Sequence, residues 1–313
     1  MNQTEKIPTV QQYDLQIQHE ITPKMVMTIG YVGNLSTHLA TGYNFNSKPF
    51  SAGATTPTAF PTLGQVVYNL NDGVSHYNSL QTQLNYRASK SLTLTSSYTW
   101  AHNIDNTNGY LGFYAVSDLN YYDHSLNKGN SSLDQKHVFV ASALYTVPFG
   151  RGQMFGSSLN RGVDYVLGGW QLNTIVQAQT GTPFSVTFPV YGGGTSIRAD
   201  YANNGQPIYT RSIQGNYLNT AAFSTAQPSG RQGTSGRNQF FGPGFAEGDV
   251  SLFKTLGITE RLKTELRAEV FNVTNTPQFQ NPDGTITDGN FGKITATRLA
   301  SERQMQMAIR FTF

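Results

Sequence analysis

Residues 304–313 read QMQMAIRFTF, and two kinds of side chain alternate along this stretch. The apolar positions are Met305, Met307, Ile309, Phe311 and Phe313. The positions between them are mainly polar. Because successive side chains of a β-strand point to opposite faces, the stretch predicts a strand with one apolar and one polar face.

The same alternation recurs along the rest of the chain. It is clear at residues 11–20, 25–31, 79–87, 92–100, 170–179 and 265–270. Strands with less distinct faces are predicted at residues 137–147, 184–190 and 249–256. Together with residues 304–313, these segments predict an all-β chain of about ten strands.

The composition limits what such strands can build. Only 12% of the 313 residues are charged, and the polar faces consist mostly of Gln, Asn, Ser and Thr. The aromatic fraction of 12% is too high for a disordered chain. A net charge of +3 without a basic stripe argues against nucleic acid as a partner. The absence of Cys excludes disulfide scaffolds, thiol catalysis and thiolate zinc sites.

Tight and long connections alternate between the predicted strands. The tight turns are residues 21–24, 88–91 and 257–262. The long connections, rich in Gly, Asn, Ser and Pro, are residues 33–77, 101–136, 181–248 and 275–302. Short turns on one side, long loops on the other, and strands with an apolar outer and a polar inner face favour an antiparallel outer-membrane β-barrel. A soluble β-sandwich or carbohydrate-binding module is a weaker hypothesis, because long structureless loops are unusual in compact soluble domains.

The orientation of the predicted strands follows from the lengths of these connections. If the chain ends on the short-turn side, Phe313 lies in the periplasm and all long loops face outside. Every predicted strand then alternates consistently.

Charged side chains occupy one face of the predicted strand at residues 265–270. Glu265, Arg267 and Glu269 stand opposite apolar side chains. Since an Arg at the bilayer midplane costs roughly 2–4 kcal/mol, these residues are predicted to face the lumen, as is Arg310. There they either line a translocation path, contact a plug, or form cross-strand ion pairs in a wet lumen.

Aromatic side chains mark the predicted membrane borders and loops. Trp100, Trp170, Tyr98 and Tyr31 lie near strand ends, where indole and phenol rings match a membrane interface. A second group lies in the predicted loops and consists of Tyr110, Phe113, Tyr114, Tyr121 and Tyr122. These rings either stack on a sugar or aromatic ligand or pack within the loops, and packing is the favoured interpretation.

The sequence gives little support for catalysis. The six His residues are scattered, and neither HExxH nor GxSxG occurs. The one enzyme alternative is an omptin-like ten-stranded outer-membrane protease, which needs Asp and His facing each other at the barrel rim. The candidate pairs are His102 with Asp105, and Asp123 with His124. We expect no enzyme activity, no cofactor and no metal site.

Short motifs in a fixed order resemble one family of outer-membrane proteins. They are GYVG (30–33), THL (37–39), VPFGRG (147–152), LGGWQ (167–171), TGTPF (180–184), DVSLFK (249–254), FNVTNTPQF (271–279), FGKITATR (291–298) and IRFTF (309–313). With them the chain resembles the C-terminal half of the barrel of TonB-dependent receptors. It is most similar to the Oar-like group, whose N-terminal part carries a carboxypeptidase-regulatory-like domain.

The resemblance implies an architecture larger than this chain. Family members have a signal peptide, a TonB-contacting segment and a plug domain before a barrel of about 22 strands. None of these N-terminal parts is visible in the sequence. We therefore expect residues 1–313 to be one barrel segment, the last ten or so strands of such a receptor, as a truncated gene product or fragment without plug or signal peptide.

The resemblance also implies a location, partners and a function. It places the chain in the outer membrane of a Gram-negative-type bacterium, in contact with lipid and with the barrel-assembly machinery. That machinery would read a terminal signal comprising Phe313, Phe311, Ile309 and Met307. An unknown external ligand would be bound and taken up, with TonB acting only through a plug domain. The alternative is a structural or adhesive barrel that closes with ten strands and transports nothing.

Overall fold

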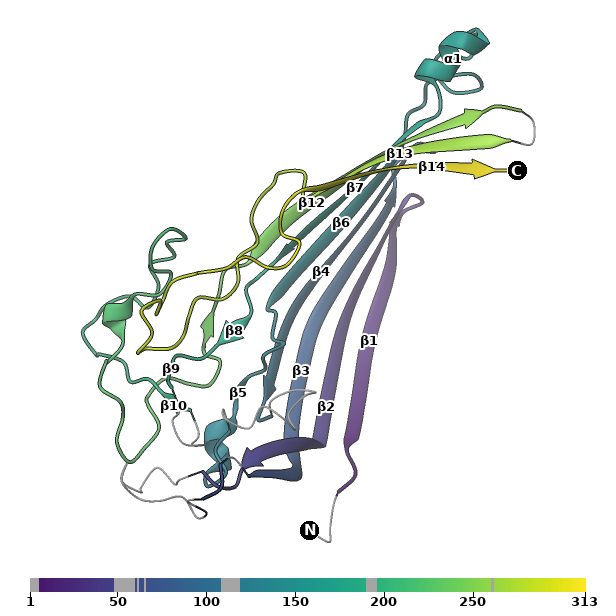
Figure 1. Ribbon diagram of the computed structural model, residues 1–313. Coiled ribbons are helices and arrows are strands. Elements are labelled where there is room, and N and C mark those ends of the chain that lie inside the picture. The colour runs from purple at the N-terminus through teal and green to yellow at the C-terminus, as the bar shows by residue number, and fades with distance from the viewer. Residues whose placement is uncertain are drawn as a thin grey trace.

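The computed structural model of the chain describes residues 6–47, 60, 62–64, 66–107, 119–189, 196–259 and 262–313. They form one large antiparallel sheet with loops gathered at one end (Figure 1). The long strands are β1 (Thr9–Thr22), β2 (Met25–Asn44), β3 (Val67–Arg87), β4 (Leu92–Asp105), β6 (His137–Thr146), β7 (Trp170–Gln179), β12 (Phe245–Gly257), β13 (Lys263–Phe271) and β14 (Gln304–Thr312). The short strand β5 (Gly129–Asn130) pairs with β4 and completes a ten-stranded sheet.

This sheet is open and not closed into a ring. Its long strands follow the order β1-β2-β3-β4-β6-β7-β12-β13-β14, and within the described residues β1 and β14 each pair on one side only. Every neighbouring pair is antiparallel, so β1 and β14 run in the same direction. The prediction of an antiparallel all-β fold is therefore confirmed.

The pairing register of the strands places the apolar side chains on one face of the sheet. One row runs from Leu15 through Tyr31 and Leu80 to Trp100, each residue paired with the next. This face is open, with Trp100 56% exposed, whereas Ser79 on the opposite face is only 3% exposed. An apolar face that is exposed across several neighbouring strands is typical of a surface that contacts a membrane or another protein.

Most long connections lie at one end of the sheet and the short ones lie at the other, as predicted. The long-loop end holds the described parts of residues 45–66, 106–136, 180–244 and 272–303. The short-turn end holds residues 23–24 and 88–91 and the described part of residues 258–262, together with the last residue of β14 (Figure 1). One connection breaks the pattern, because residues 147–169 between β6 and β7 are long and lie at the short-turn end.

That exceptional connection contains a short helix, α1 (Arg161–Leu167). The side chain of Asn160 caps its first turn by accepting a hydrogen bond from the Val163 backbone nitrogen at 2.9 Å. The helix stops at Gly168, and Gly169 adopts a φ of +69° that favours glycine before β7 begins. Two further short helices, η1 (His124–Asn127) and η2 (Thr220–Ala222), lie in the long loops. Among the described residues, no helix is long and apolar enough to cross a membrane.

The β2–β3 hairpin reaches beyond its neighbours at the long-loop end. Pairing continues to Asn44 and Val67, although the sequence predicted a loop over residues 33–77. The register shifts between Ser36 and Leu39, and β2 bends sharply toward its end in Figure 1. The prediction of a loop over this whole stretch is wrong for the parts that extend the two strands.

The predicted strand at residues 184–190 is also wrong. The described part forms two short strands, β8 (Pro183–Phe184) and β9 (Thr187–Phe188), outside the large sheet. These pair with β11 (Phe240–Phe241) and β10 (Ile197–Arg198), respectively. Their apolar side chains pack in a core that the long loops form, and not against lipid. The alternation of apolar and polar residues therefore resembled that of a lipid-facing strand. Val190 lies outside the described residues.

Candidate functional site

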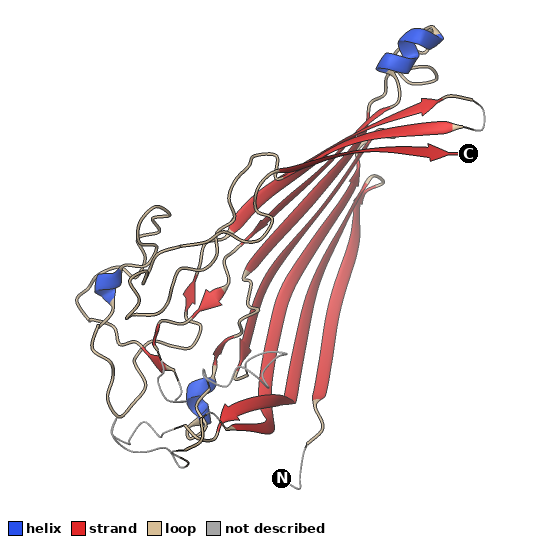
Figure 2. Cartoon of the chain, in the orientation of Figure 1, coloured by secondary structure: helices blue, strands red, loops and turns tan. Residues whose placement is uncertain are grey.

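The long loops between β7 and β12 and between β13 and β14 fold together into a layer with its own apolar core. We call the described parts of residues 180–244 and 272–303 the loop layer. Figure 2 shows them beside the sheet, mostly as tan loops with short red strands and a short blue helix. The buried core residues are Val186, Phe188, Ala199, Leu218, Ala222, Phe223, Phe240, Ile286 and Phe291. Phe223 packs edge-on against Phe240 and Phe291, with ring centroids 5.3 and 5.7 Å apart. The layer is therefore a packed structure.

Arg237 fixes the loop layer to the sheet. Its Nη1 lies 2.7 Å from Oδ1 of Asp105 at the end of β4, and both side chains are buried. Nη1 also donates to the carbonyl oxygen of Asn127, and Nη2 donates to that of Thr107. The guanidinium thus joins the loop layer to the β4–β6 connection with several charge-assisted hydrogen bonds.

A second buried arginine, Arg198, tightens the same contact. Its Nε donates to the carbonyl oxygen of Ser235 at 2.9 Å, and its Nη1 donates to that of Leu126 at 3.2 Å. Burial and the nearby Arg237 guanidinium lower the pKa of Arg198. Both guanidinium groups hold backbone carbonyls, so they act as structural clamps between loops.

Polar side chains complete the contact between the loop layer and the rest of the sheet. Asn130 and Asn238 exchange hydrogen bonds, each Nδ2 donating to the other's carbonyl oxygen at 2.8 and 2.9 Å. Gln278 donates from Nε2 to the carboxylate of Glu247 on β12. Because Glu247 and Asp105 belong to the polar face, the loop layer folds over that face and not over the apolar one.

Aromatic side chains of the β2–β3 hairpin form a cluster with Tyr121 and His124 of the β4–β6 connection. The rings of Tyr43 and His124 stack with centroids 4.7 Å apart. Tyr121 packs edge-on against Phe45 at 5.3 Å and against Tyr68 at 6.2 Å. Of the loop aromatics singled out from the sequence, Tyr121 thus packs within the loops.

The other loop aromatics divide into two groups. Tyr122 contacts the Tyr121 ring and donates from its hydroxyl to the carbonyl oxygen of Ser47 at 2.7 Å. It too is engaged within the loops. The remaining three, Tyr110, Phe113 and Tyr114, lie outside the described residues.

The His–Asp pairs considered for a protease do not form. His102 contacts Asp134 with Nδ1 and Oδ2 3.2 Å apart, while Asp105 pairs with Arg237. His124 likewise contacts another carboxylate, that of Asp72, at 2.8 Å. The described residues contain no group of three or more His, Asp or Glu side chains that could hold a metal ion. The absence of enzyme activity and of a cofactor stays a prediction.

The charged row on β13 lies on the polar face. Arg267 donates from Nε to Oε1 of Glu265 at 2.6 Å, and its guanidinium lies over the Phe253 ring. Glu269 accepts hydrogen bonds from Ser251 and from Gln306 on the two neighbouring strands. The ion pair therefore runs along one strand and not across strands. That this face lines a lumen stays a prediction.

The terminal strand β14 is an exposed edge. Arg310 is paired in register with Glu265, which places it on the polar face. Met307, Ile309 and Phe311 share the apolar face, and Phe313 extends beyond the strand. Recognition of these four residues by an assembly machinery stays a prediction.

The predicted interface aromatics lie on the apolar face. Tyr31 and Trp100 lie in one row across the sheet, Tyr98 lies two residues nearer the short-turn end of β4, and Trp170 begins β7 at the short-turn end. The Tyr98 hydroxyl lies 2.7 Å from Nδ1 of His137. The role of these four residues at the membrane interface stays a prediction.

One charged side chain on the apolar face was missed. Lys254 shares this face with Leu252 and pairs with Trp170 and Leu266. It is buried, and its Nζ donates to the carbonyl oxygens of Val166 and Gly168 at the end of α1. The period-two pattern of DVSLFK could have revealed it, because Lys254 falls on the same parity as Leu252.

Comparison with solved structures finds similarity to outer-membrane proteins. The outer membrane transporter YddB from Escherichia coli matches with a TM-score of 0.54 and 11% identity, over 98% of this chain and 33% of that chain. The ferripyoverdine receptor of the outer membrane of Pseudomonas aeruginosa matches with a TM-score of 0.47 and 10% identity, over 97% of this chain and 27% of that chain. The chain thus spans about a third of the length of YddB.

Comparison of sequences agrees with the fold. No curated protein matches the chain. A family model described as an outer membrane beta barrel domain matches residues 1–306. The open apolar face, the sorted connections and this match lead to one conclusion: the chain belongs to the outer membrane beta-barrel domain family, and its location is the outer membrane.

Proposed function

We propose that this chain is the barrel segment of a TonB-dependent receptor-like protein that binds a bulky external ligand and takes it up. The observation that carries the proposal is the loop layer, clamped to the polar face of the sheet by Arg237 and Asp105. Loops that only connect strands need no buried core. A preorganised outer surface, in contrast, lowers the entropic cost of holding a ligand.

The role that we propose for each part of the protein follows from the resemblance to TonB-dependent receptors. The loop layer captures ligand outside, and the row of Glu265, Arg267 and Glu269 lines the path within the barrel. A plug domain gates the lumen, and TonB supplies force through that plug. The ligand leaves chemically unchanged, so we propose no enzyme activity for this chain.

The Oar-like group is the subgroup that we propose. Support comes from the ordered motifs, several of which occupy defined places in the fold. GYVG lies in β2, DVSLFK lies in β12 and IRFTF ends β14. The chain spans about a third of YddB, which supports a barrel with further strands.

The alternative, a self-closing structural barrel, is not favoured. β1 and β14 run in the same direction, so direct pairing between them would create a parallel seam in an otherwise antiparallel sheet. Bacterial single-chain barrels have an even number of antiparallel strands.

Surface labelling tests the orientation that ligand capture requires. The chain contains no Cys, so one engineered Cys is the only labelling site. Leu299→Cys, in the loop layer, is expected to react with a membrane-impermeant maleimide in intact cells. Lys90→Cys, in the turn between β3 and β4 at the short-turn end, is expected to react only after the outer membrane is permeabilised. The reverse pattern would contradict external capture by the loop layer.

Ligand binding is tested on outer membranes that contain the full chain. Suitable probes are maltoheptaose, ferrichrome and a hydrophilic peptide, which represent sugars, chelated metals and peptides. We expect saturable binding of one probe, weakened by Arg237→Met and kept by Arg231→Met, whose ion pair with Asp200 is exposed. Binding of none of the three above membranes without the chain would refute capture of these ligand classes.

A further inference from the structure

The connection between β6 and β7 exposes apolar side chains at the short-turn end. Met154 is 80% exposed and Val166 is 65% exposed. Further exposed apolar residues in this connection are Phe155, Val163, Tyr165 and Leu167. A connection that faced only water would not be expected to display so many large apolar groups together.

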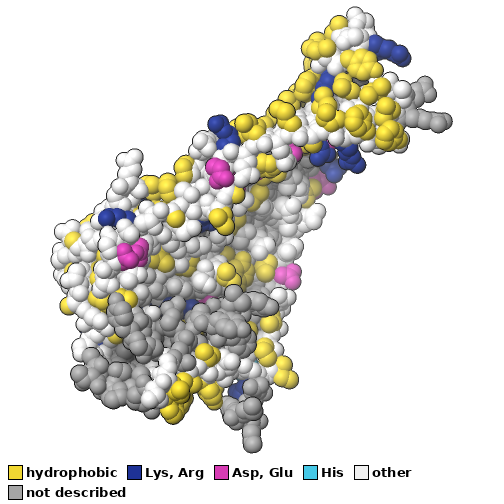
Figure 3. Space-filling model, viewed as in Figure 1, with side chains coloured by type: hydrophobic (Ala, Val, Ile, Leu, Met, Phe, Trp, Pro, Cys, Tyr) yellow, Lys and Arg dark blue, Asp and Glu magenta, His cyan; other side chains and the backbone are white. Residues whose placement is uncertain are grey.

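Lys254 holds this connection against the lipid-facing side of the sheet. Its Nζ donates to the Val166 carbonyl oxygen at 3.2 Å and to that of Gly168, and it lies 5.0 Å from the centre of the Trp170 ring. The end of α1 is therefore seated on the apolar face of β12. Figure 3 shows hydrophobic side chains continuing from the sheet onto this end, with basic side chains beside them. The exposed apolar groups thus continue the membrane-facing surface at its periplasmic border.

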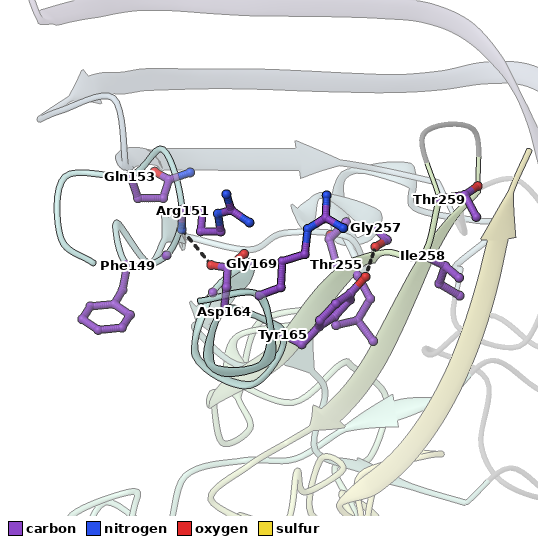
Figure 4. A pocket seen from close by; sticks show the side chains of 14 residues that line it. Phe149, Arg151, Gln153, Asp164, Tyr165, Gly169, Thr255, Gly257, Ile258 and Thr259 are labelled. Carbon is purple, nitrogen blue, oxygen red and sulfur yellow. Dashed lines mark hydrogen bonds between the residues drawn. The ribbon is translucent and has the colours of Figure 1, made fainter. Parts of the chain in front are cut away.

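A pocket of about 640 Å³ separates this connection from the β12–β13 turn. Figure 4 shows Arg151 and Asp164 on one side of it, with Ile258 and Thr259 on the other. Tyr165 closes part of the gap by donating from its hydroxyl to the Gly257 carbonyl oxygen at 2.6 Å.

The pocket presents two free positive charges. Arg151 and Arg161 both line it, and neither guanidinium forms an ion pair with a carboxylate of the described residues. The one carboxylate in the lining, that of Asp164, already accepts a hydrogen bond from the Arg151 backbone nitrogen at 2.7 Å. Planar guanidinium groups bind phosphate and carboxylate groups bidentately, and a membrane border supplies phosphate groups.

The whole short-turn end is basic. Its described strand ends and connections carry eight Lys and Arg residues against three Asp and Glu residues. The basic residues are Lys24, Arg87, Lys90, Arg151, Arg161, Lys254, Lys263 and Arg310. The acidic ones are Glu20, Asp164 and Glu265. This excess complements an anionic membrane surface.

We propose that residues 147–169 are a membrane-interface anchor that binds the phosphate of an anionic phospholipid in the periplasmic leaflet. Met154, Phe155 and Val166 insert among the acyl chains, while Arg151 and Arg161 bind the headgroup. This arrangement combines apolar insertion with charge attraction, as in interfacial amphipathic segments. The proposal rests on the fold and the outer-membrane location, and it is independent of ligand capture by the loop layer.

The depth of insertion is the first test. A fluorophore is attached to Met154→Cys in the full chain, in vesicles of phosphatidylcholine and phosphatidylglycerol whose acyl chains are brominated. We expect strong quenching by the bromines and weak quenching by iodide in the water. The matched control, Leu133→Cys in the β4–β6 connection, is expected to show the opposite pattern. Equal exposure of both labels to iodide would refute insertion.

The bound lipid is the second test, and it does not depend on vesicle refolding. The full chain is extracted from cells in mild detergent, and the phospholipids that remain bound are identified by mass spectrometry. We expect enrichment of phosphatidylglycerol over phosphatidylethanolamine, falling about fivefold for each of Arg151→Gln and Arg161→Gln. The control Lys90→Gln, in another turn at the same end, is expected to keep the enrichment. An unchanged lipid ratio in the double arginine variant would refute headgroup binding, and a co-purified protein on this surface would refute a lipid occupant.

Discussion

Arg237 and Asp105 form an ion pair 2.7 Å long although 132 positions separate them in the chain. Their side chains are only 6% and 5% exposed. Because a buried charge without its partner is strongly destabilising, this contact joins the packing of the loop layer to the end of β4.

Loss of the buried guanidinium is expected to release the loop layer. Arg237→Met leaves the Asp105 carboxylate buried without its cation, which costs about 3–5 kcal/mol. The sheet itself loses no strand pairing, so its β-sheet circular dichroism should be unchanged. Limited proteolysis of membrane-embedded protein measures the change as faster cleavage within residues 180–244.

The matched control for this prediction is the exposed ion pair of Arg231 and Asp200. Arg231→Met removes the same type of side chain from the same loop, but exposed pairs contribute only about 0–1 kcal/mol. Equal protease sensitivity of the two variants would show that the buried pair has no special role.

Acid is expected to loosen the loop layer only slightly through Asp200, because an exposed ion pair contributes about 0–1 kcal/mol. Its carboxylate accepts two hydrogen bonds from Arg231 and one from the Thr234 backbone nitrogen. The Arg231 hydrogen bond holds the pKa of Asp200 below its ordinary value of 3.8. A lowered folded-state pKa gives stability that is complete above the ordinary value and is lost as the pH falls through the lowered one.

Pepsin digestion measures this effect, since the protease works in acid. We expect cleavage of the loop layer to accelerate below about pH 3.8. Asp200→Asn should remove that part of the pH dependence. If wild type and variant follow the same pH curve, Asp200 is not the group responsible.

Gly33 makes room for the Tyr13 ring on the apolar face. A Cβ at position 33 would lie 2.1 Å from Cε2 of Tyr13, its partner across the β1–β2 pair. Gly33→Ala is therefore expected to displace the ring and to cost about 1–3 kcal/mol. Urea unfolding in detergent, followed by circular dichroism, measures this loss.

A double-mutant cycle separates the clash from other effects of this substitution. Adding Tyr13→Ala should remove most of the penalty of Gly33→Ala. Gly257→Ala is the control, because nothing lies within 4 Å of a Cβ at the end of β12. A penalty that persists without the Tyr13 ring would contradict the steric explanation.

Deletion of Phe313 is expected to reduce assembly into the outer membrane several-fold if the terminal strand is a recognition signal. The residue is exposed and lies on the alternation of Met307, Ile309 and Phe311. Quantitative blotting of outer-membrane fractions measures the effect. Thr312→Ser, on the polar face, should leave the amount unchanged, and equal levels for both variants would argue against the signal.

The strands were predictable because lipid imposes a simple rule on them. Where one face meets hydrocarbon and the other meets polar groups, alternation appears in the sequence, as in β14 and β4. The lengths of the connections predicted which of them lie together at each end of the sheet. Only the β6–β7 connection broke that rule, because it is long although it lies at the short-turn end.

Features outside the lipid zone were not predictable in the same way. In the β2 extension to Asn44, Thr37 and Thr41 interrupt the apolar positions Leu35, Leu39 and Tyr43, so the period of two is weak there. The alternation of Phe184, Val186 and Phe188 resembled a lipid-facing strand, although their partners are other loop residues. The contact of Arg237 with Asp105 spans too many positions for local patterns to reveal.

The shared direction of β1 and β14 restricts what can complete this sheet. A complement that forms antiparallel seams at both edges has to begin and end with strands of the opposite direction, and so has an odd number of strands. A second copy in the same membrane orientation begins and ends with strands in the direction of β1. Both seams between two such copies would be parallel, so the geometry favours a different stretch of polypeptide as the partner.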